Sequence, residues 1–191
     1  MKLRRLLILT VALSLAGGSA IYADTIAQKV RIVVNKQEID DQGILEDGKA
    51  YVGVRSLADL MKALVVWDDS AKKVSIVKPN VHMFLMDGSK PFGGVERGKK
   101  SFKVFSQVDN LTVPISAFRV TIADPYGDEK EIETHTSKES DFPTDKDNFW
   151  FTSGEYSYNF SSVGKYTIRF WMKSADGNAF QVVSEKTVFA K

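Results

Sequence analysis

Hydrophobic and polar positions follow two different patterns along the chain. Between residues 30 and 77, short apolar segments surround one stretch with the i, i+3, i+4, i+7 spacing of an amphipathic helix. From residue 81 onward the alternation has a period of two, and turn-forming residues separate the alternating segments. The first pattern predicts a small α+β unit, and the second predicts an all-β unit. The helical positions are Leu57, Leu60, Met61 and Leu64.

The first unit is predicted to contain one helix among five strands. Ser56 suits the N-cap of the helix, and Asp59 stands three residues later as in a capping box. Pro79 interrupts the strand pattern and suits a linker, so we predict separable units joined near residues 78–81. The predicted strands are residues 30–34, 37–39, 50–54, 64–67 and 73–77.

The second unit is predicted to be an immunoglobulin-like antiparallel β-sandwich, because seven strands at regular spacing are typical of that fold. In residues 118–122 and 166–170 the apolar side chains share one face, as a half-buried strand requires. Gly177 suits a hairpin turn with a positive φ. The predicted strands are residues 81–86, 102–108, 115–123, 130–134, 149–158, 165–173 and 180–189. The fold class is therefore mainly β, with a small α+β N-terminal module and then the sandwich.

Residues 51–68 resemble a known module. The positions Tyr51-Val52-x-Val54-Arg55-x-Leu57-Ala58 and Val65-x-Trp67-Asp68 look like the core of the copper amine oxidase N-terminal-like domain, a stalk module of secreted proteins in Gram-positive bacteria. The resemblance implies a scaffold without chemistry of its own. The family usually has Asn-Gly where Asn35-Lys36 stands, proline where Gly53 stands and glycine where Lys62 stands. Without that glycine, the helix is either longer or slightly strained at its end.

A second resemblance lies near the C-terminus. Residues 164–168, Gly-Lys-Tyr-Thr-Ile, look like the penultimate strand of bacterial immunoglobulin-like and fibronectin-like domains. This implies that the hydroxyl of Tyr166 bonds back to the preceding corner of the chain.

Residues 1–23 are predicted to be a secretory signal peptide, because a basic start, an apolar segment and small residues follow in order. Cleavage after Ala23 or Ala20 fits equally well, and an uncleaved anchor helix is disfavoured by the short apolar segment. The predicted domains are then residues 24–79 and 80–191. We expect a protein that is secreted or extracellular, and association with the cell wall is one alternative. After removal of the signal peptide, we expect no insertion into the membrane.

Charge argues against nucleic acid as a binding partner, and the absence of cysteine excludes disulfides. The sequence has 26 basic and 24 acidic residues, and three of the basic residues lie in the predicted signal peptide. The nearly neutral mature chain has no overall field that would gather nucleic acid. It contains no cysteine, so an exported chain of this kind must be stabilised by its core without disulfides.

The sequence predicts neither an enzyme nor a cofactor. His82 and His135 are isolated in sequence, whereas a copper amine oxidase site needs three histidines and a modified tyrosine. We therefore expect structural or surface roles for both histidines. Ser70-x-x-Lys73 matches a bare Ser-Lys pattern, but its companion motifs are missing.

Two groups of residues are candidate binding sites. Asp145, Asp147 and Asn148 offer oxygen ligands suited to calcium, although a solvated loop is the alternative reading. The second group consists of aromatic residues of the predicted sandwich. An exposed ring among them could stack on a sugar or anchor a protein, and the alternative is that these rings pack in the core or between the domains. Alternation places Trp150 on the face opposite Phe149 and Phe151. The candidate ligand-binding residues are Trp150, Trp171, Tyr156 and Tyr158.

The functional prediction is a secreted, non-catalytic binding or scaffold protein of the cell envelope. Its sandwich would contact cell-wall or matrix polysaccharide, or another exported protein. One alternative is a protease inhibitor or an accessory domain of a secreted hydrolase. A purely structural spacer is the other alternative.

Overall fold

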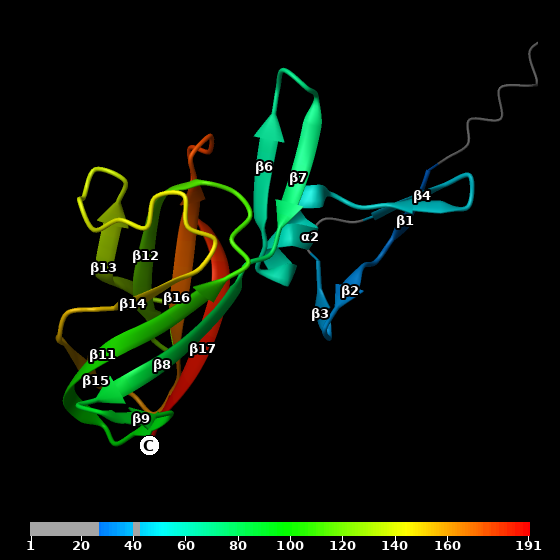
Figure 1. Ribbon diagram of the computed structural model, residues 1–191. Helices are drawn as coiled ribbons and strands as arrows, with labels where there is room; N and C mark the ends of the chain where they lie inside the picture. Colours follow the sequence, from blue (N-terminus) through cyan, green and yellow to red (C-terminus); the bar gives the residue numbers. More distant parts are fainter. Residues whose placement is uncertain (1–26, 40–42) are drawn as a thin grey trace, which may run out of the picture.

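The computed structural model describes residues 27–39 and 43–191, so the predicted signal peptide lies outside the described residues. In these ranges the chain is mainly β, with one helix and several antiparallel sheets, which confirms the predicted fold class. Figure 1 shows a β-sandwich at one side and short strands around helix α2 (Val54–Met61) at the other.

The strands before residue 78 form three small antiparallel sheets, ordered β1-β4-β5, β2-β3 and β6-β7. The predicted strand at residues 30–34 is divided, because residues 28–30 pair with β4 whereas residues 33–34 pair with β3. The strands are β1 (Gln28–Val30), β2 (Val33–Val34), β3 (Gln37–Glu38), β4 (Gly43–Glu46), β5 (Lys49–Tyr51), β6 (Leu64–Asp68) and β7 (Lys73–Val77).

Helix α2 starts earlier than the sequence predicts. Its N-cap is Gly53, which has no side chain that could cap the helix. Leu57 N–H donates to Gly53 O at 3.1 Å. The prediction of Ser56 as N-cap is therefore wrong, because Ser56 already lies in the first turn. Lys62 ends the helix in the left-handed region at φ 56°, so the strained end is the correct alternative.

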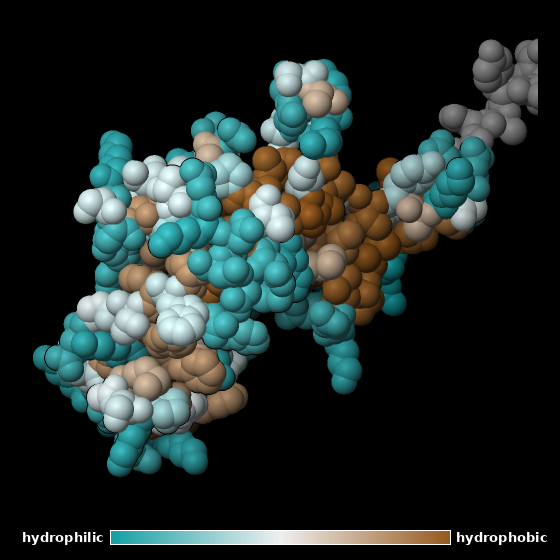
Figure 2. Space-filling model, viewed as in Figure 1, coloured by the Kyte–Doolittle hydropathy of each residue, from teal (hydrophilic) through white to brown (hydrophobic). Residues whose placement is uncertain are grey.

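The predicted apolar face of the helix is only partly buried. Ala58 is fully buried and Leu57 and Leu60 are half-buried, whereas Met61 is exposed. Leu64 is fully buried, but it belongs to β6. Figure 2 shows hydrophobic side chains gathered on the surface over α2 and the neighbouring N-terminal strands.

The sandwich consists of two five-stranded sheets. One has the order β10-β17-β16-β12-β13, and the other has the order β14-β11-β8-β9, with β15 also paired to β11. The strands are β8 (Asn80–Asp87), β9 (Lys90–Phe92), β10 (Gly94–Val95), β11 (Gly98–Asp109), β12 (Ile115–Ala123), β13 (Glu129–Thr136), β14 (Phe149–Thr152), β15 (Tyr156–Phe160), β16 (Gly164–Ser174) and β17 (Gln181–Ala190).

This strand order is that of an immunoglobulin-like sandwich. The third, penultimate and last main strands (β12, β16 and β17) share one sheet, and the first two (β8 and β11) share the other with β14 and β15. Short β10 joins β17 in parallel, whereas the other pairs are antiparallel. Tyr166 forms the predicted corner, because its hydroxyl donates to Ser162 O at 3.1 Å.

Two details of the sandwich differ from the prediction. The strand expected at residues 149–158 is divided into β14 and β15 around buried Ser153, whose Oγ accepts a bond from Val104 N–H at 2.9 Å. Gly177 does not have a positive φ. A side chain there would instead collide with Ser174, since an added Cβ would lie 2.4 Å from Ser174 Oγ.

The sandwich core also takes in part of the N-terminal unit. Leu64 belongs to its buried cluster, and Val77 packs against that cluster. Gln181 on β17 pairs with the backbone of Val65, accepting its N–H at 2.8 Å and donating to its oxygen at 3.3 Å. No sheet in residues 27–39 and 43–191 mixes strands from the two units. The boundary at residues 79–80 remains a prediction.

Candidate functional site

An aromatic row lies on the outer face of the sheet β14-β11-β8. Phe105 on β11 is paired in register with Phe84 on β8, and Trp150 on β14 lies diagonally across from it. The ring centroids are 6.4 Å apart between Phe84 and Phe105, and 6.3 Å apart between Phe105 and Trp150. Trp150 is 74% exposed and Phe84 is 45% exposed, so the row is open to solvent.

The row borders a shallow apolar hollow of about 430 Å³. Met86, Pro91 and the aliphatic part of Lys103 line it beside Phe84 and Phe105. Cationic and amide groups lie close by. The Lys186 ammonium sits 6.0 Å from the centre of the Phe84 ring, and Gln107 lies directly opposite Trp150 in the strand register. The surface therefore combines ring faces with hydrogen-bonding side chains.

The other predicted aromatic residues do not join this row. Trp171 lies half-buried on the outer face of the opposite sheet, where its Nε1–H donates to Thr121 Oγ1 at 2.8 Å and the Arg119 guanidinium lies 4.8 Å from its ring. Tyr156 is half-buried, with its ring edge against Phe102. Tyr158 is 8% exposed in the core, and burial raises its pKa to about 12. Its ring cannot form a stacking platform.

The predicted oxygen ligands of the acidic loop serve different purposes. Asn148 Oδ1 accepts a bond from Asn110 N–H at 3.2 Å, and the backbone oxygen of Asp147 accepts one from Leu111 N–H at 3.0 Å. These bonds hold the β13–β14 loop against the β11–β12 loop. Asp145 has a left-handed φ of 54° and lines a small hollow beside Asp147.

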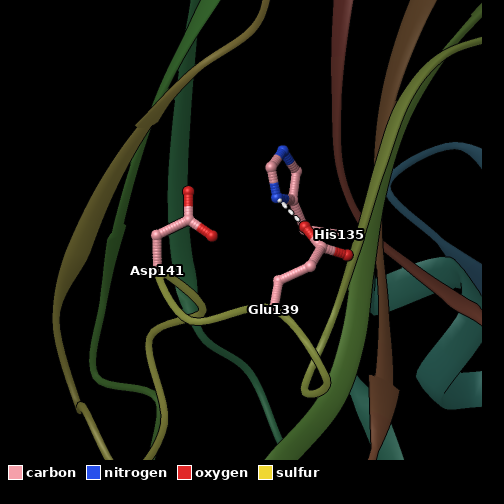
Figure 3. A group of neighbouring side chains, drawn as sticks. All are labelled: His135, Glu139 and Asp141. Atoms are coloured by element: carbon pink, nitrogen blue, oxygen red, sulfur yellow. Dashed lines mark ion pairs between the residues drawn. The ribbon is translucent and has the colours of Figure 1, made fainter.

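The same loop creates a cluster that sequence reasoning missed. His135 at the end of β13 lies between two glutamates: Nε2 is 2.7 Å from Glu133 Oε1, and Nδ1 is 2.7 Å from Glu139 Oε2. Ligand atoms of His135, Glu139 and Asp141 all lie within 4.8 Å of one another. Figure 3 shows Glu139 and Asp141 reaching toward the ring from the chain that follows β13.

Local turns explain why these residues meet. Glu139 N–H donates to Thr136 O at 3.0 Å, and Glu139 Oε1 accepts from Thr136 N–H at 2.8 Å, so the chain reverses directly after the strand. The signal in the sequence is the spacing His135-x-x-x-Glu139-x-Asp141. This spacing does not follow the period of two of a strand. It indicates a cluster only once the turn after β13 is known to bring Glu139 and Asp141 back toward His135.

The imidazole of His135 packs against two aromatic rings. Its ring stacks on Phe118 at 5.2 Å and meets the edge of Phe151 at 5.1 Å. Partial burial lowers the pKa of His135, but the bond to Glu133 and the charges of Glu139 and Glu133 outweigh that effect, so the pKa is raised above its usual 6.5.

The cluster opens on a pocket of about 450 Å³ that is also lined by Trp150. Lys146 and Asn148 line the same pocket. Trp150 therefore borders both the aromatic row on the outer face and the pocket that contains His135.

The fold and these surface features define a β-sandwich protein with a small α+β unit ahead of the sandwich and an exposed aromatic row on one sheet. Residues 33–117 match the family described as Copper amine oxidase N-terminal domain, which confirms the resemblance for that segment, under half of the chain. That domain is a non-catalytic stalk module. The match extends through β8 and β11 but ends before His135 and Trp150. No curated protein matches the sequence.

The part of the chain in residues 27–39 and 43–191 contains no helix of the length and apolar character needed to cross a membrane.

Proposed function

We propose that this protein is a secreted, non-catalytic binding protein of the cell envelope whose sandwich binds polysaccharide through the row Phe84, Phe105 and Trp150. One observation carries the proposal. A tryptophan that is 74% exposed lies 6.3 Å, centroid to centroid, from a second aromatic ring on the outer face of a sheet. Large aromatics are usually buried, so such a group on the surface marks an interaction site.

The chemistry of the row suits a sugar chain. The apolar C–H face of a pyranose can lie on an aromatic ring while its hydroxyls reach polar side chains at the edge. Gln107 and Lys103 stand on the same outer face, and both can bond hydroxyls. The near balance of acidic and basic residues also favours a neutral ligand over a highly charged one.

The inclination of the rings to one another indicates which form of polysaccharide could bind. The planes of Phe84 and Phe105 are inclined by 37°, and those of Phe105 and Trp150 by 59°. A flat crystalline surface cannot lie on three rings with these inclinations. A single, twisted polysaccharide chain can present successive sugar faces to them.

The test is binding of the secreted chain to soluble and insoluble wall polysaccharides, measured by affinity electrophoresis and pull-down. Replacing Trp150 by alanine should weaken binding by about 5- to 150-fold, which corresponds to about 1–3 kcal/mol for a stacked aromatic anchor. Phe84→Ala should weaken it less. The melting temperature of the Trp150 variant should stay near that of the wild type, because the side chain is exposed.

Trp67→Ala is the matched control. Trp67 is also exposed, at 52%, but it lies on β6, away from the row. Loss of binding in both tryptophan variants, or in neither, would count against the aromatic row. N-terminal sequencing of material recovered outside the cell tests the export part, with a start near Asp24 expected.

A protein partner is the second candidate, and the exposed apolar residues of the N-terminal unit favour it. Ile44 and Tyr51 lie opposite each other in β4 and β5, and Trp67 and Val74 do so in β6 and β7. Such pairs are apolar surface that another exported protein could cover. A protein recovered by cross-linking with the wild type but lost in Tyr51→Ser would support this role.

A further inference from the structure

The two ring nitrogens of His135 face different carboxylates. Nε2 lies 2.7 Å from a Glu133 oxygen, and Nδ1 lies 2.7 Å from a Glu139 oxygen. Glu133 therefore occupies the Nε2 side of the ring. On the Nδ1 side, ligand atoms of His135, Glu139 and Asp141 all lie within 4.8 Å of one another.

We propose that His135 Nδ1, Glu139 and Asp141 form a binding site for a divalent transition-metal ion of the zinc type. The three ligands lie outside the aromatic row, which meets the same pocket only at Trp150, and the proposal does not depend on the proposed polysaccharide binding. An imidazole nitrogen with two carboxylate oxygens is a donor set that Zn²⁺ accepts, whereas calcium prefers oxygen ligands alone.

The distances permit such an ion after a small adjustment. The three ligand atoms lie within 4.8 Å of one another. Around a tetrahedral ion with bonds of about 2.0–2.2 Å, ligand atoms stand roughly 3.3–3.6 Å apart. The present gap of 2.7 Å between Nδ1 and Glu139 Oε2 would therefore widen by somewhat under 1 Å, and the gaps to Asp141 would close.

The surroundings hold the ligands in place. Glu133 accepts Gly154 N–H with Oε2 at 2.6 Å and faces His135 Nε2 with Oε1, which forms the carboxylate–histidine pair found behind metal-ligating imidazoles. Glu139 Oε1 accepts from Thr136 N–H and Oγ1–H at 2.8 and 3.1 Å, so Oε2 stays directed at the ring. Phe118 and Phe151 fix the plane of the imidazole.

Asp141 supplies the adaptable ligand. It is exposed, and among the described residues its carboxylate has neither a hydrogen-bond partner nor an ion-pair partner. Figure 3 shows its oxygens on the side of the ring where Nδ1 meets Glu139. A fourth position would face the pocket of about 450 Å³ beside Trp150 and would be filled by water or by an oxygen of a ligand.

The experiment is equilibrium dialysis of the chelator-treated secreted chain against Zn²⁺ near pH 7.5, with bound metal measured by elemental analysis. The wild type should bind one equivalent. Asp141→Asn should weaken binding at least tenfold without affecting the fold, and Glu133→Gln should weaken it by about 10- to 100-fold, as loss of an outer carboxylate does. His135→Ala should abolish it. His82→Ala removes the other histidine of the sequence and should bind like the wild type.

Other results would overturn the site. Absence of Zn²⁺ binding by the wild type at millimolar concentration is one, and binding retained in both Asp141→Asn and His135→Ala is another. Circular dichroism identifies a His135 variant that fails to fold, and in that case the exposed Asp141 variant decides. Tryptophan fluorescence gives a second measure, since Zn²⁺ should change the emission of the wild type but not that of Asp141→Asn or of Trp150→Phe, which keeps Trp67 and Trp171.

Discussion

The two halves of this chain bury their apolar residues very differently. In the sandwich, two sheets face each other and enclose a continuous core that includes Phe102, Phe118 and Phe170. In the described part of the N-terminal unit the buried hydrophobic residues are few, two of the four are alanines, and only Leu64 among them enters the continuous core. Val33, Tyr51, Trp67 and Ile76 are exposed there.

The difference follows from strand length and layering. Strands of the N-terminal unit have two to five residues, and its three small sheets do not stack on one another as a sandwich does. Its most deeply buried large side chain, Leu64, packs into the core of its neighbour. The sandwich therefore takes most of its buried apolar side chains from its own strands, whereas the N-terminal unit buries its largest one, Leu64, in the core of its neighbour.

The largest expected effect tests the contrast directly. Phe170→Ala removes a fully buried ring from the centre of the sandwich and should lower the free energy of unfolding by about 3–5 kcal/mol. Ile76→Ala, at a position that is 48% exposed, should change it by less than about 0.5 kcal/mol. Urea unfolding of both variants measures this. Similar losses would mean that the N-terminal unit has a hidden core of its own.

Leu64→Ala sharpens the comparison at the contact between the halves. It should cost about 2–4 kcal/mol, because Leu64 is fully buried in the sandwich cluster, and it should speed proteolysis at the predicted linker near residues 78–81. Leu60→Ala is the matched control, since Leu60 is half-buried on α2 and outside that cluster. Equal sensitivity of the two variants would place Leu64 in a core limited to the N-terminal unit.

The smallest effect concerns the ion pairs of Glu185, which faces Lys62 at 3.3 Å and Arg169 at 2.9 Å. Burial raises the pKa of Glu185, but Arg169 and Lys62 outweigh it and leave the pKa below its usual 4.5. The unfolded chain therefore binds this proton more readily, and the stabilisation is present above about pH 4.5 and lost as pH falls through the lowered pKa.

Glu185→Gln should accordingly lower stability by about 0.5–1 kcal/mol at pH 7, a small value because the pair is partly exposed. The difference from the wild type should shrink below pH 4.5. Melting curves between pH 3 and 7 would show this, with Glu131→Gln on the exposed edge of β13 as control. A constant difference across the range would assign the loss to packing and not to charge.

Much of the sandwich could be predicted because alternation reports burial directly. Val120, Ile122, Ile168 and Phe170 are fully buried as the period-two pattern indicates, and Trp150 is exposed on the face opposite Phe149. The division around Ser153 could not be predicted, since it depends on a bond between Ser153 Oγ and the distant Val104 N–H.

In the N-terminal unit, one strand was missed and the start of the helix was misplaced. Strand β4 was not predicted, although Asp47-Gly48 is a strong hairpin signal and both residues have positive φ. The helix start was misplaced because a serine suited to capping lies three residues after Gly53, the actual N-cap.

The candidate site could not be predicted from the pattern of any single strand. Trp150 could be placed on an outer face, but its nearness to Phe105 and Phe84 depends on the register of three strands. His135 seemed isolated because its partners Glu139 and Asp141 are brought back by a turn held by Thr136. Both features depend on pairing and chain reversal, which residue spacing alone does not specify.

The parallel pairing of β10 with β17 has a mechanical consequence. Phe189 N–H bonds Gly93 O at 3.2 Å, and Lys191 N–H bonds Val95 O at 3.0 Å, while β16 holds the other edge of β17. Tension applied to Lys191 along the strand would load the bonds on both edges in shear, so that they must break together. The two-stranded hairpins ahead of the sandwich would peel open bond by bond at lower force, and under tension they would lengthen before the sandwich yields.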